Sequence, residues 1–361
     1  MLGEATKHHS MKDFAPYIIS QGNSILEALR RLNDLSGKAT TLFVVDDAGR
    51  LTGTLTDGDV RRALISGGTL EMPVENAMHR DFRALRGDGI DVAAIRAIRA
   101  LRINMVPRLN ADGSIAEIYD FTRLRSILPI DAVLMAGGKG ERLRPLTLNT
   151  PKPLLKVGDK AIIDYNIARL ARNGITNITV TTNYLAEQIE QHFATEVEGV
   201  MVKCLKEPCR LGTIGAVKLV RNFSHDHLLV MNSDLLTSIN LEDMYLSHID
   251  SGAQLTVAVI SYMVSVPYAI MRSENNRIVG LEEKPTYNYY ANAGIYLFNR
   301  NLISLIPENE YFDATDFLDR IIAEGGKINQ FPINGTWIDI GSPDDFRQAG
   351  ELMKHKQMLD F

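Results

Sequence analysis

Residues 131–153 read DAVLMAGGKGERLRPLTLNTPKP, and this stretch decides the fold that we expect. The apolar run at 131–136 predicts a buried β-strand, and the glycine-rich segment 137–140 follows it directly. Glycines let backbone N–H groups approach an oxyanion because no Cβ stands in the way. Arginine adds a planar fork of donors that matches phosphate oxygens. The loop is therefore suited to a polyphosphate, and its cations are Lys139, Arg142, Arg144 and, between two prolines, Lys152.

Strands and helices alternate from this stretch to the C-terminus. The alternation predicts an α/β domain with a Rossmann-like, doubly wound mixed sheet whose strands are mostly parallel. Ligands bind such sheets beyond the carboxyl ends of the strands, where the glycine loop and Asp234 both fall. We expect helices to end at Asn173-Gly174 and Gly325-Gly326. The expected strands are 131–136, 177–183, 200–205, 227–234, 255–260, 293–299 and 328–333, and the expected helices are 162–174, 184–193 and 313–326.

A weak internal repeat precedes this domain. The segment 42–64, LFVVDDAGRLTGTLTDGDVRRAL, resembles the segment 106–124, VPRLNADGSIAEIYDFTRL. Each copy predicts a strand, a glycine-containing turn, a second strand and a helix. We therefore divide the chain into an α+β domain at 1–128 and the α/β domain at 129–361. A helix-like segment stands upstream of each copy, at 24–32 and 91–101.

The duplicated unit resembles a tandem pair of CBS domains. The best match is GTLTDGDV at 53–60, which is similar to that family's Gly-x-x-Thr-x-x-Asp pattern. The resemblance implies that Thr56 and Asp59 hold the ribose of an adenine nucleotide. In the second copy Asp120 and Arg123 stand at the equivalent positions, so we expect no second site there. A module that only dimerises and binds no ligand is the alternative.

Composition and charge exclude several classes of protein. The 361 residues are 45% hydrophobic and 23% charged, as is ordinary for a globular protein. No apolar run reaches the roughly 18 residues of a membrane span, and no secretory signal is evident, so we expect a cytoplasmic protein without a membrane partner. The net charge of −5, without a basic stripe, argues against nucleic-acid binding. Cys204 and Cys209 have no nearby histidine, so we expect free thiols.

The full string AGGKGERLRPLT, with PKPLL after it, closely matches the sugar-1-phosphate nucleotidyltransferases, and further motifs follow in that family's order. The resemblance covers residues 131 to about 347. It implies transfer of a nucleotidyl group from an NTP to a sugar 1-phosphate, with release of pyrophosphate. A non-catalytic sensor of adenine nucleotides and an assembly scaffold are the alternatives from other classes. The nucleotide-binding residues that the resemblance implies are Ala136, Gly137, Gly138, Gly140, Glu207, Gly212 and Thr213.

Glu207 is the residue from which we predict the base. It opens the motif EPCRLGTIGAV at 207–217, which is similar to the family's base-binding segment. A carboxylate accepts two hydrogen bonds, which suits the adjacent N1–H and N2–H₂ donors of guanine. Thymine and uracil offer one N–H between two carbonyls, for which an amide fits better. Glu207 therefore favours GTP, with a thymidylyl- or uridylyltransferase as the alternative; a plain surface charge at a strand end is the structural alternative.

Four more motifs carry the residues that the resemblance places around the two phosphates. They are VMNSD at 230–234, GLEEKP at 280–285, NAG at 292–294 and TWIDIGSPDDF at 336–346. Ser233 stands where the family usually has glycine. Because the sugar phosphate arrives ionised, the implied chemistry needs no protein base, only cations that bring two anions together. The resemblance assigns Mg²⁺ to Asp234 and Asp339, the departing pyrophosphate to Arg142, the sugar phosphate to Lys152 and Lys284, and the sugar to Glu283 and Asn292.

The sugar stays open at this point. A CBS pair before a transferase resembles enzymes of bacterial amino-sugar and nonulosonic-acid pathways, which favours glucosamine or N-acetylglucosamine 1-phosphate. Mannose, glucose and heptose 1-phosphates are alternatives, because the loops at 285–294 and 311–316 would decide the choice. We expect a homo-oligomer whose partners are GTP, a sugar 1-phosphate and, at the CBS pair, an adenine nucleotide.

Overall fold

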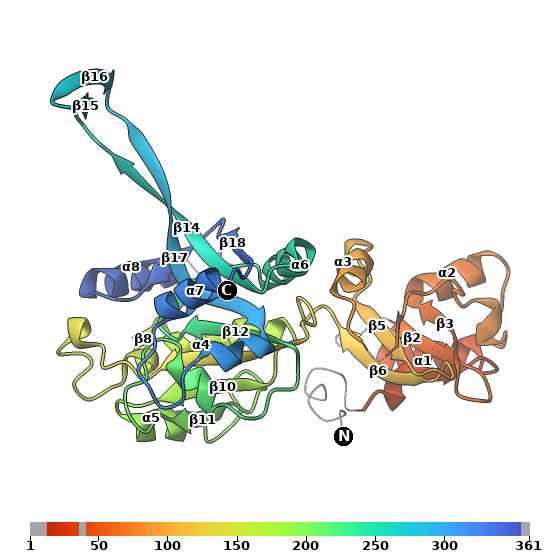
Figure 1. The fold of residues 1–361 in the computed structure, drawn as a ribbon. Helices are drawn as coiled ribbons and strands as arrows, with labels where there is room; N and C mark the ends of the chain where they lie inside the picture. Colours follow the sequence, from red (N-terminus) through yellow and green to blue (C-terminus); the bar gives the residue numbers. More distant parts are fainter. Residues whose placement is uncertain (1–12, 36–40, 88, 355–361) are drawn as a thin grey trace. The chain divides into compact units, whose positions relative to one another are not determined.

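The computed structural model describes residues 13–35, 41–87 and 89–354, and the chain divides into two compact units (Figure 1). The first comprises Met1–Leu128 with Arg172–Gly174, and the second comprises Pro129–Ala171 with Ile175–Phe361. Within the described ranges no helix has both the length and the apolar character to cross a membrane. Both cysteines are free thiols, as expected.

The first unit contains the same three-stranded arrangement twice. Strand β1 pairs in parallel with β2, which pairs antiparallel with β3; β4, β5 and β6 repeat this order and these directions. The strands of the predicted repeat are therefore present in both copies. The elements are η1 (Ala15–Tyr17), β1 (Ile18–Ser20), α1 (Ile25–Asp34), β2 (Thr41–Val45), β3 (Leu51–Thr56), α2 (Asp57–Ile65), η2 (Val74–Asn76), β4 (Leu85–Arg86), α3 (Val92–Ala100), β5 (Met105–Leu109) and β6 (Ile115–Asp120).

The two copies differ at their C-terminal ends. In the first copy β3 leads directly into α2, which Thr56 caps. In the second copy the expected helix is wrong, because residues 121–123 form a turn after β6 and no helix follows them. Pro129 lies close behind this turn and disfavours helical backbone in the residue before it. The apolar residues Leu124 and Ile127 are instead buried in the core of this unit.

The second unit is built on a seven-stranded sheet in the order β11-β10-β7-β12-β17-β14-β18. The four strands from β11 to β12 are parallel, β17 is antiparallel to both of its neighbours, and β18 is parallel to β14. The sheet is therefore mixed, as predicted, and β7 is a central strand that is buried over almost its whole length. The strands are β7 (Ile130–Ala136), β10 (Ile178–Thr182), β11 (Lys203–Lys206), β12 (His227–Asn232), β14 (Leu255–Ser265), β17 (Thr286–Asn299) and β18 (Ile328–Pro332).

The helices of this unit include the three that the sequence predicted, α4, α5 and α7, and two that it did not. Helix α6 follows Asn240, whose side chain accepts a hydrogen bond from the Asp243 N–H. Helix α8 begins at Pro343 and buries Ala349 and Met353. The bounds are α4 (Ile162–Arg172), α5 (Ala186–His192), α6 (Leu241–Ser251), α7 (Ala314–Ala323), α8 (Pro343–Lys354), η3 (Glu141–Leu143), η4 (Lys152–Leu154), η5 (Gly215–Leu219) and η6 (Arg300–Leu305).

Three pairs of short strands complete the unit, and one of them lies at the end of a long projection. Strands β14 and β17 continue beyond the seven-stranded sheet as a two-stranded ribbon, which the hairpin β15-β16 extends. We call residues 261–290 the arm; Figure 1 shows it projecting far from the rest of the second unit. The pairs are β8 (Lys156–Val157) with β9 (Lys160–Ala161), β13 (Leu235–Thr237) with β19 (Trp337–Asp339), and β15 (Ile270–Glu274) with β16 (Arg277–Glu282).

Candidate functional site

The glycine loop leaves the carboxyl end of β7 in a conformation that only small residues allow. A Cβ at Gly137 would lie 2.7 Å from Oε1 of Glu207, and Gly140 has φ +60° with the Thr147 side chain 3.0 Å from its Cβ position. The Thr147 hydroxyl also donates to the Gly140 carbonyl at 2.8 Å, which holds the turn. At Gly138 nothing lies within 4 Å of the Cβ position, so backbone there is open to a ligand.

This loop forms one wall of a pocket at the carboxyl ends of the parallel strands. The pocket brings together predicted site residues that are up to about a hundred positions apart in the chain. The lining residues are Met135, Ala136, Gly137, Gly138, Lys152, Pro153, Glu207, Arg210, Gly212, Thr213, Asn232, Ser233, Asp234 and Tyr311.

Glu207 lies at the pocket wall directly after β11, with its carboxylate packed against Gly137. Only 6% of the residue is exposed, so it is not a surface charge. Its Oε2 accepts a hydrogen bond from the Leu211 N–H at 3.4 Å. Burial raises the pKa of this carboxyl, and the hydrogen bonds from Leu211 and Thr181 partly oppose that rise. A desolvated carboxylate of this kind is a strong acceptor for paired N–H donors.

Gly212 lines the same pocket, but the need for glycine there comes from packing. Its φ is +81°, and a Cβ would lie 2.5 Å from the Phe312 carbonyl oxygen. Thr213 next to it donates through both N–H and Oγ1 to the Asp313 carboxylate, at 2.9 and 3.0 Å. The segment after Glu207 is thereby fixed to the start of α7.

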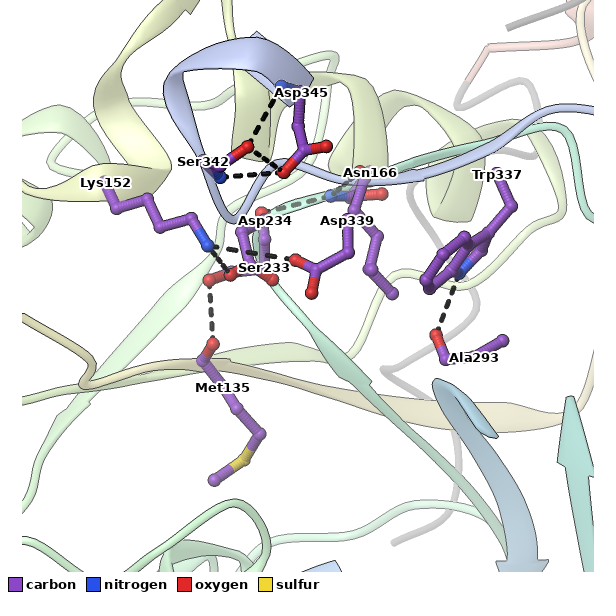
Figure 2. Close-up of polar contacts among 11 residues, drawn as sticks. Met135, Lys152, Asn166, Ser233, Asp234, Ala293, Trp337, Asp339, Ser342 and Asp345 are labelled. Carbon is purple, nitrogen blue, oxygen red and sulfur yellow. Dashed lines mark hydrogen bonds and ion pairs between the residues drawn. The ribbon is translucent and has the colours of Figure 1, made fainter. Parts of the chain in front are cut away.

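Asp234 sits where β12 ends, on a turn that neighbouring side chains hold tightly (Figure 2). The Asn166 side-chain amide, from α4, donates to the carbonyls of Ser233 at 3.2 Å and Leu235 at 3.0 Å, one on each side of Asp234. The Ser233 hydroxyl donates to the Met135 carbonyl at 2.7 Å, which joins this turn to the end of β7. The serine that replaces the expected glycine therefore makes a useful bond, and the carboxylate of Asp234 has a fixed position.

Asp339 reaches Asp234 through a strand pair that the sequence did not reveal. Strand β13 begins directly after Asp234, and β19 ends at Asp339; in their antiparallel register Leu235 pairs with Asp339. Lys152 lies between the two carboxylates. Its Nζ is ion-paired with Asp234 Oδ2 and lies 3.8 Å from Asp339 Oδ1 (Figure 2). Two acids and a buried lysine thus meet at the pocket.

The electrostatics of this acid pair fit a cation. Burial raises the pKa of Asp339, and the negative charge of Asp234 adds to the rise, while Lys152 and Arg142 oppose it. Asp234 Oδ1 is buried and has no hydrogen-bond partner, so one carboxylate oxygen is left for a ligand. The described residues contain no cluster of three or more metal-ligating side chains. Two carboxylates suit Mg²⁺, which keeps water and substrate phosphate oxygens in its shell.

Arg142 lies on η3, outside the pocket lining but beside the acid pair. A Cβ at Gly341 would be 2.9 Å from Arg142 Nη2, so the guanidinium occupies the space that this glycine leaves. The Gly341 N–H donates to the Asp339 carbonyl at 2.7 Å, which places the arginine and the acid on one turn. The structure therefore brings Arg142, Lys152, Asp234 and Asp339 together.

The predicted sugar contacts are not brought to the pocket of the same chain. Glu283 and Lys284 are exposed on the arm, between β16 and β17, and neither lines the pocket. Lys284 has φ +45°, an uncommon backbone conformation for a residue other than glycine. Asn292, nearer the sheet, donates to the Tyr296 hydroxyl at 2.8 Å and accepts from the Gly294 N–H at 2.9 Å. Trp337 donates through Nε1 to the neighbouring Ala293 carbonyl at 3.0 Å (Figure 2).

Six lining residues were not among the predicted site residues, namely Met135, Pro153, Arg210, Asn232, Ser233 and Tyr311. Arg210 lines the pocket, and its guanidinium lies 5.6 Å from the ring centre of Tyr311, another lining residue. The Tyr311 hydroxyl donates to Asp313 at 2.9 Å. Arg210 falls inside the motif that Glu207 opens, so an arginine three residues after that acid was the available signal. Tyr311 opens the loop 311–316, which the sequence analysis expected to decide the sugar without assigning a role to this residue.

In the first unit Thr56 and Asp59 form a capping box at the start of α2. The Thr56 hydroxyl donates to Asp59 Oδ2 at 2.6 Å, and each side chain also accepts from the other residue's N–H. Asp59 further pairs with Arg62. The side chains that the CBS resemblance assigns to a ribose therefore also stabilise the helix.

Comparisons with known proteins find two family models in the chain. Residues 131–356 match the family model described as nucleotidyl transferase, and residues 11–66 match the CBS domain model. D-glycero-α-D-manno-heptose 1-phosphate guanylyltransferase from Aneurinibacillus thermoaerophilus is 29% identical over 229 residues, which are 63% of this chain and 99% of that protein. Mannose-1-phosphate guanylyltransferase from Mycobacterium tuberculosis is 32% identical over 237 residues, 62% of this chain and 65% of that protein.

One solved structure supports the fold of the second unit. A putative glucose-1-phosphate thymidylyltransferase from Bacillus anthracis, in complex with a sucrose, is 25% identical with a TM-score of 0.51. That match covers 64% of this chain and 97% of the other. The mannose-1-phosphate guanylyltransferase catalytic subunit beta of Dictyostelium discoideum is matched over only 62% of its own length.

Proposed function

This chain belongs to the nucleotidyl transferase family, and we propose that it transfers a guanylyl group from GTP to a sugar 1-phosphate, releasing pyrophosphate. The observation that carries the proposal is one pocket that joins the glycine loop of β7 to Lys152, Asp234 and a buried Glu207. The loop offers backbone donors to a triphosphate, and the acid pair lies where the α-phosphate and an incoming phosphate would meet. A non-catalytic sensor would need none of these residues in one place.

The chemistry asks the protein to bring two anions together. Two unit charges at about 4 Å repel by about 4 kcal/mol at an effective dielectric near 20. Lys152 and Arg142 reduce this repulsion, and Asn166 and Ser233 hold the turn on which Asp234 sits. Asp234 and Asp339 would hold Mg²⁺, which when bound supplies further positive charge between the phosphates. Positioning and charge stabilisation are then the chain's whole contribution, since the sugar phosphate is already a nucleophile.

The assignment of guanine rests on Glu207. Its carboxylate is buried at the pocket wall, keeps Oε1 beside Gly137, and would accept from the N1–H and N2–H₂ groups of guanine. Relatives named as guanylyltransferases support this choice. The solved neighbour named as a thymidylyltransferase keeps thymidylyl transfer as the alternative within the class.

We assign Glu283, Lys284 and Asn292 to the sugar phosphate. In the single chain the first two lie on the arm, so their contact with substrate has to form when substrate binds or when chains assemble. Lys284→Ala should raise the KM for the sugar phosphate at least tenfold and leave the KM for GTP within about twofold. Lys218→Ala is the control, because this lysine lies on η5 and no motif assigns it to a substrate.

A panel assay tests the function as a whole. Pyrophosphate release is measured for ATP, GTP, UTP and dTTP, each with glucosamine, N-acetylglucosamine, mannose, glucose and heptose 1-phosphates. The proposal expects GTP to give the highest kcat/KM with at least one sugar, and the named relatives direct attention to mannose and heptose. The proposal would be overturned if none of the NTP and sugar 1-phosphate pairs released pyrophosphate.

For the first unit we propose an adenine-nucleotide site at Thr56 and Asp59, supported by the CBS domain match. Calorimetry of the full chain with AMP, ADP and ATP tests it, with Thr56→Val as the variant and Thr52→Val on the same strand as the control. Equal heats for the two variants, or none for the parent chain, would end this assignment.

A further inference from the structure

Arg210 is the only arginine among the described lining residues of the pocket, and no acid of the described chain binds it. Neither a hydrogen bond nor an ion pair joins its guanidinium to a residue that the structure describes. Its contact is with an aromatic ring, since the guanidinium carbon lies over Tyr311, 5.6 Å from the ring centre. A guanidinium that rests on a ring keeps the N–H groups along its edge, so these donors remain available to a ligand.

Tyr311 is itself held by the motif at 207–217. Its hydroxyl donates to the Asp313 carboxylate at 2.9 Å. The same carboxylate accepts from Thr213 through the N–H at 2.9 Å and through Oγ1 at 3.0 Å. The ring beneath Arg210 is therefore tied to the wall of the pocket that this motif forms.

Arg210 and Glu207 extend from one short turn. Oε2 of Glu207 accepts from the Leu211 N–H at 3.4 Å, which closes this turn with Arg210 inside it. The acid pair and the lysine between its carboxylates stand on other elements of the chain. The arginine therefore shares its wall with the carboxylate that we assign to the base, and not with the groups that we assign to the phosphates.

Guanine presents acceptors and donors on neighbouring edges. Its N1–H and N2–H₂ groups are donors, and its O6 and N7 atoms are acceptors. The carboxylate of Glu207 suits the donors, and an arginine fork suits the acceptors, which is the commonest base-specific contact in protein–DNA complexes. Adenine carries an N6–H₂ donor in place of O6, and uracil and thymine have no N7. Of these bases only guanine satisfies both charged groups.

We propose that Arg210 is a specificity-determining residue that donates to O6 and N7 of guanine, and that Tyr311 is a positioning residue that holds the guanidinium for this contact. The inference rests on the proposed function, since it takes GTP as the nucleotide. It adds a second charged group to a recognition that otherwise depends on Glu207. Because the donors of a base are positive and its acceptors negative, an acid and an arginine on one wall favour a single orientation of guanine.

Two GTP analogues separate this contact from the rest of the pocket. 7-Deaza-GTP lacks the N7 acceptor and keeps O6, N1–H and N2–H₂, whereas ITP keeps O6 and N7 and lacks the N2–H₂ group. With the parent chain, each analogue should give a kcat/KM about fivefold below that of GTP, because each loses one hydrogen bond to a charged group. Arg210→Ala should lower kcat/KM for GTP about tenfold, use GTP and 7-deaza-GTP within about twofold of each other, and still discriminate against ITP.

Tyr311→Leu tests the positioning role. It should weaken the discrimination against 7-deaza-GTP without removing it, and leave the discrimination against ITP unchanged, which a general loss of structure would not do. The control is Arg221→Ala, at an exposed arginine that is ion-paired with Glu308 at 3.2 Å. It should keep both ratios at the parent values, and thermal unfolding verifies that all three variants fold.

Three outcomes would overturn the proposal. One is an Arg210→Ala variant that still discriminates between GTP and 7-deaza-GTP. Another is a loss that appears in the KM for the sugar 1-phosphate and not in that for GTP, which would assign Arg210 to the second phosphate. The third is a parent chain that uses GTP and 7-deaza-GTP equally, which would leave the proposed function intact, whereas a parent chain that is inactive with GTP would remove both proposals.

Discussion

The substitution Glu207→Gln keeps the shape of the side chain but changes what it offers to the pocket. Oε2 accepts from the Leu211 N–H at 3.4 Å, so an amide would place its oxygen there. Its NH₂ group would then occupy the position of Oε1, beside Gly137. The pocket would lose an acceptor for the donors of guanine and present donors in its place.

The expected magnitude follows from one lost hydrogen bond to the carboxylate, at a position where the amide now presents a donor. A hydrogen bond to a charged group contributes about 1.5–3 kcal/mol, so the transition state with GTP should lose about 3 kcal/mol, on the order of 100-fold in kcat/KM. UTP and dTTP present carbonyl oxygens and should gain relative to GTP. Pyrophosphate release is measured with each NTP well below its KM. The matched control is Glu187→Gln, which removes the same charge from an exposed pair with Lys206.

Two results would refute this reasoning. One is a kcat/KM for GTP within about threefold of the parent value, and the other is an equal fall for all four NTPs. Because burial raises the pKa of Glu207, acidification should weaken GTP binding at a higher pH than an ordinary glutamate would, and Glu207→Gln should abolish that dependence. The raised folded pKa also means that the stability linked to this group is present below its unfolded pKa and lost as pH rises. The glutamine variant without ligand should therefore melt at a higher temperature than the parent at neutral pH.

Asp234→Asn should lower kcat at least about 10³-fold at any sugar phosphate concentration, while Asp319→Asn on the exposed side of α7 should not; near-normal turnover would remove the metal assignment. Gly341→Ala should lower kcat on the order of tenfold, because its Cβ would displace the Arg142 guanidinium. The control is Gly350→Ala, which should leave kcat unchanged because nothing lies within 4 Å of its Cβ position. Equal kcat values for the two variants would contradict the contact. Burial lowers the pKa of His248 in the folded chain. As pH drops below about 6.5, the unfolded chain therefore binds a proton at this histidine more readily than the folded chain does, and the free energy of unfolding should decrease. The melting temperature of His248→Gln should fall less between about pH 7.5 and 5.5, and parallel curves would exclude this histidine as a cause.

Local pattern was sufficient for the part of the fold that forms the glycine-loop wall of the pocket. An apolar run before glycines predicted β7 and its loop, and the motif of Glu207 predicted a residue that the structure buries at the same pocket. The strand pair β13-β19 was not predictable in this way, because each strand has three residues and exists only through a partner about a hundred positions away. The ion pair between Lys152 and Asp234 is likewise non-local. The family resemblance had assigned Lys152 to the sugar phosphate and not to this acid.

Lys284 is assigned to the sugar phosphate, although it lies on the arm. Lys152 is already committed to the acid pair, and Arg210, the remaining cation among the described lining residues, is assigned to the base and not to a second phosphate. Lys284 is a third candidate, but it does not line the pocket of its own chain. If the chain assembles as a dimer in which Lys284 of one copy reaches the pocket of the other, dimers of Asp234→Asn chains with Lys284→Ala chains contain one complete site. Each variant alone should then have little activity at a sugar phosphate concentration well below the KM of the Lys284→Ala variant, and an equal mixture after subunit exchange should recover about a quarter of the parent activity, since half of the dimers are mixed. No recovery would show that each chain uses its own Lys284, and the arm would then have to bend back to the pocket when substrate binds.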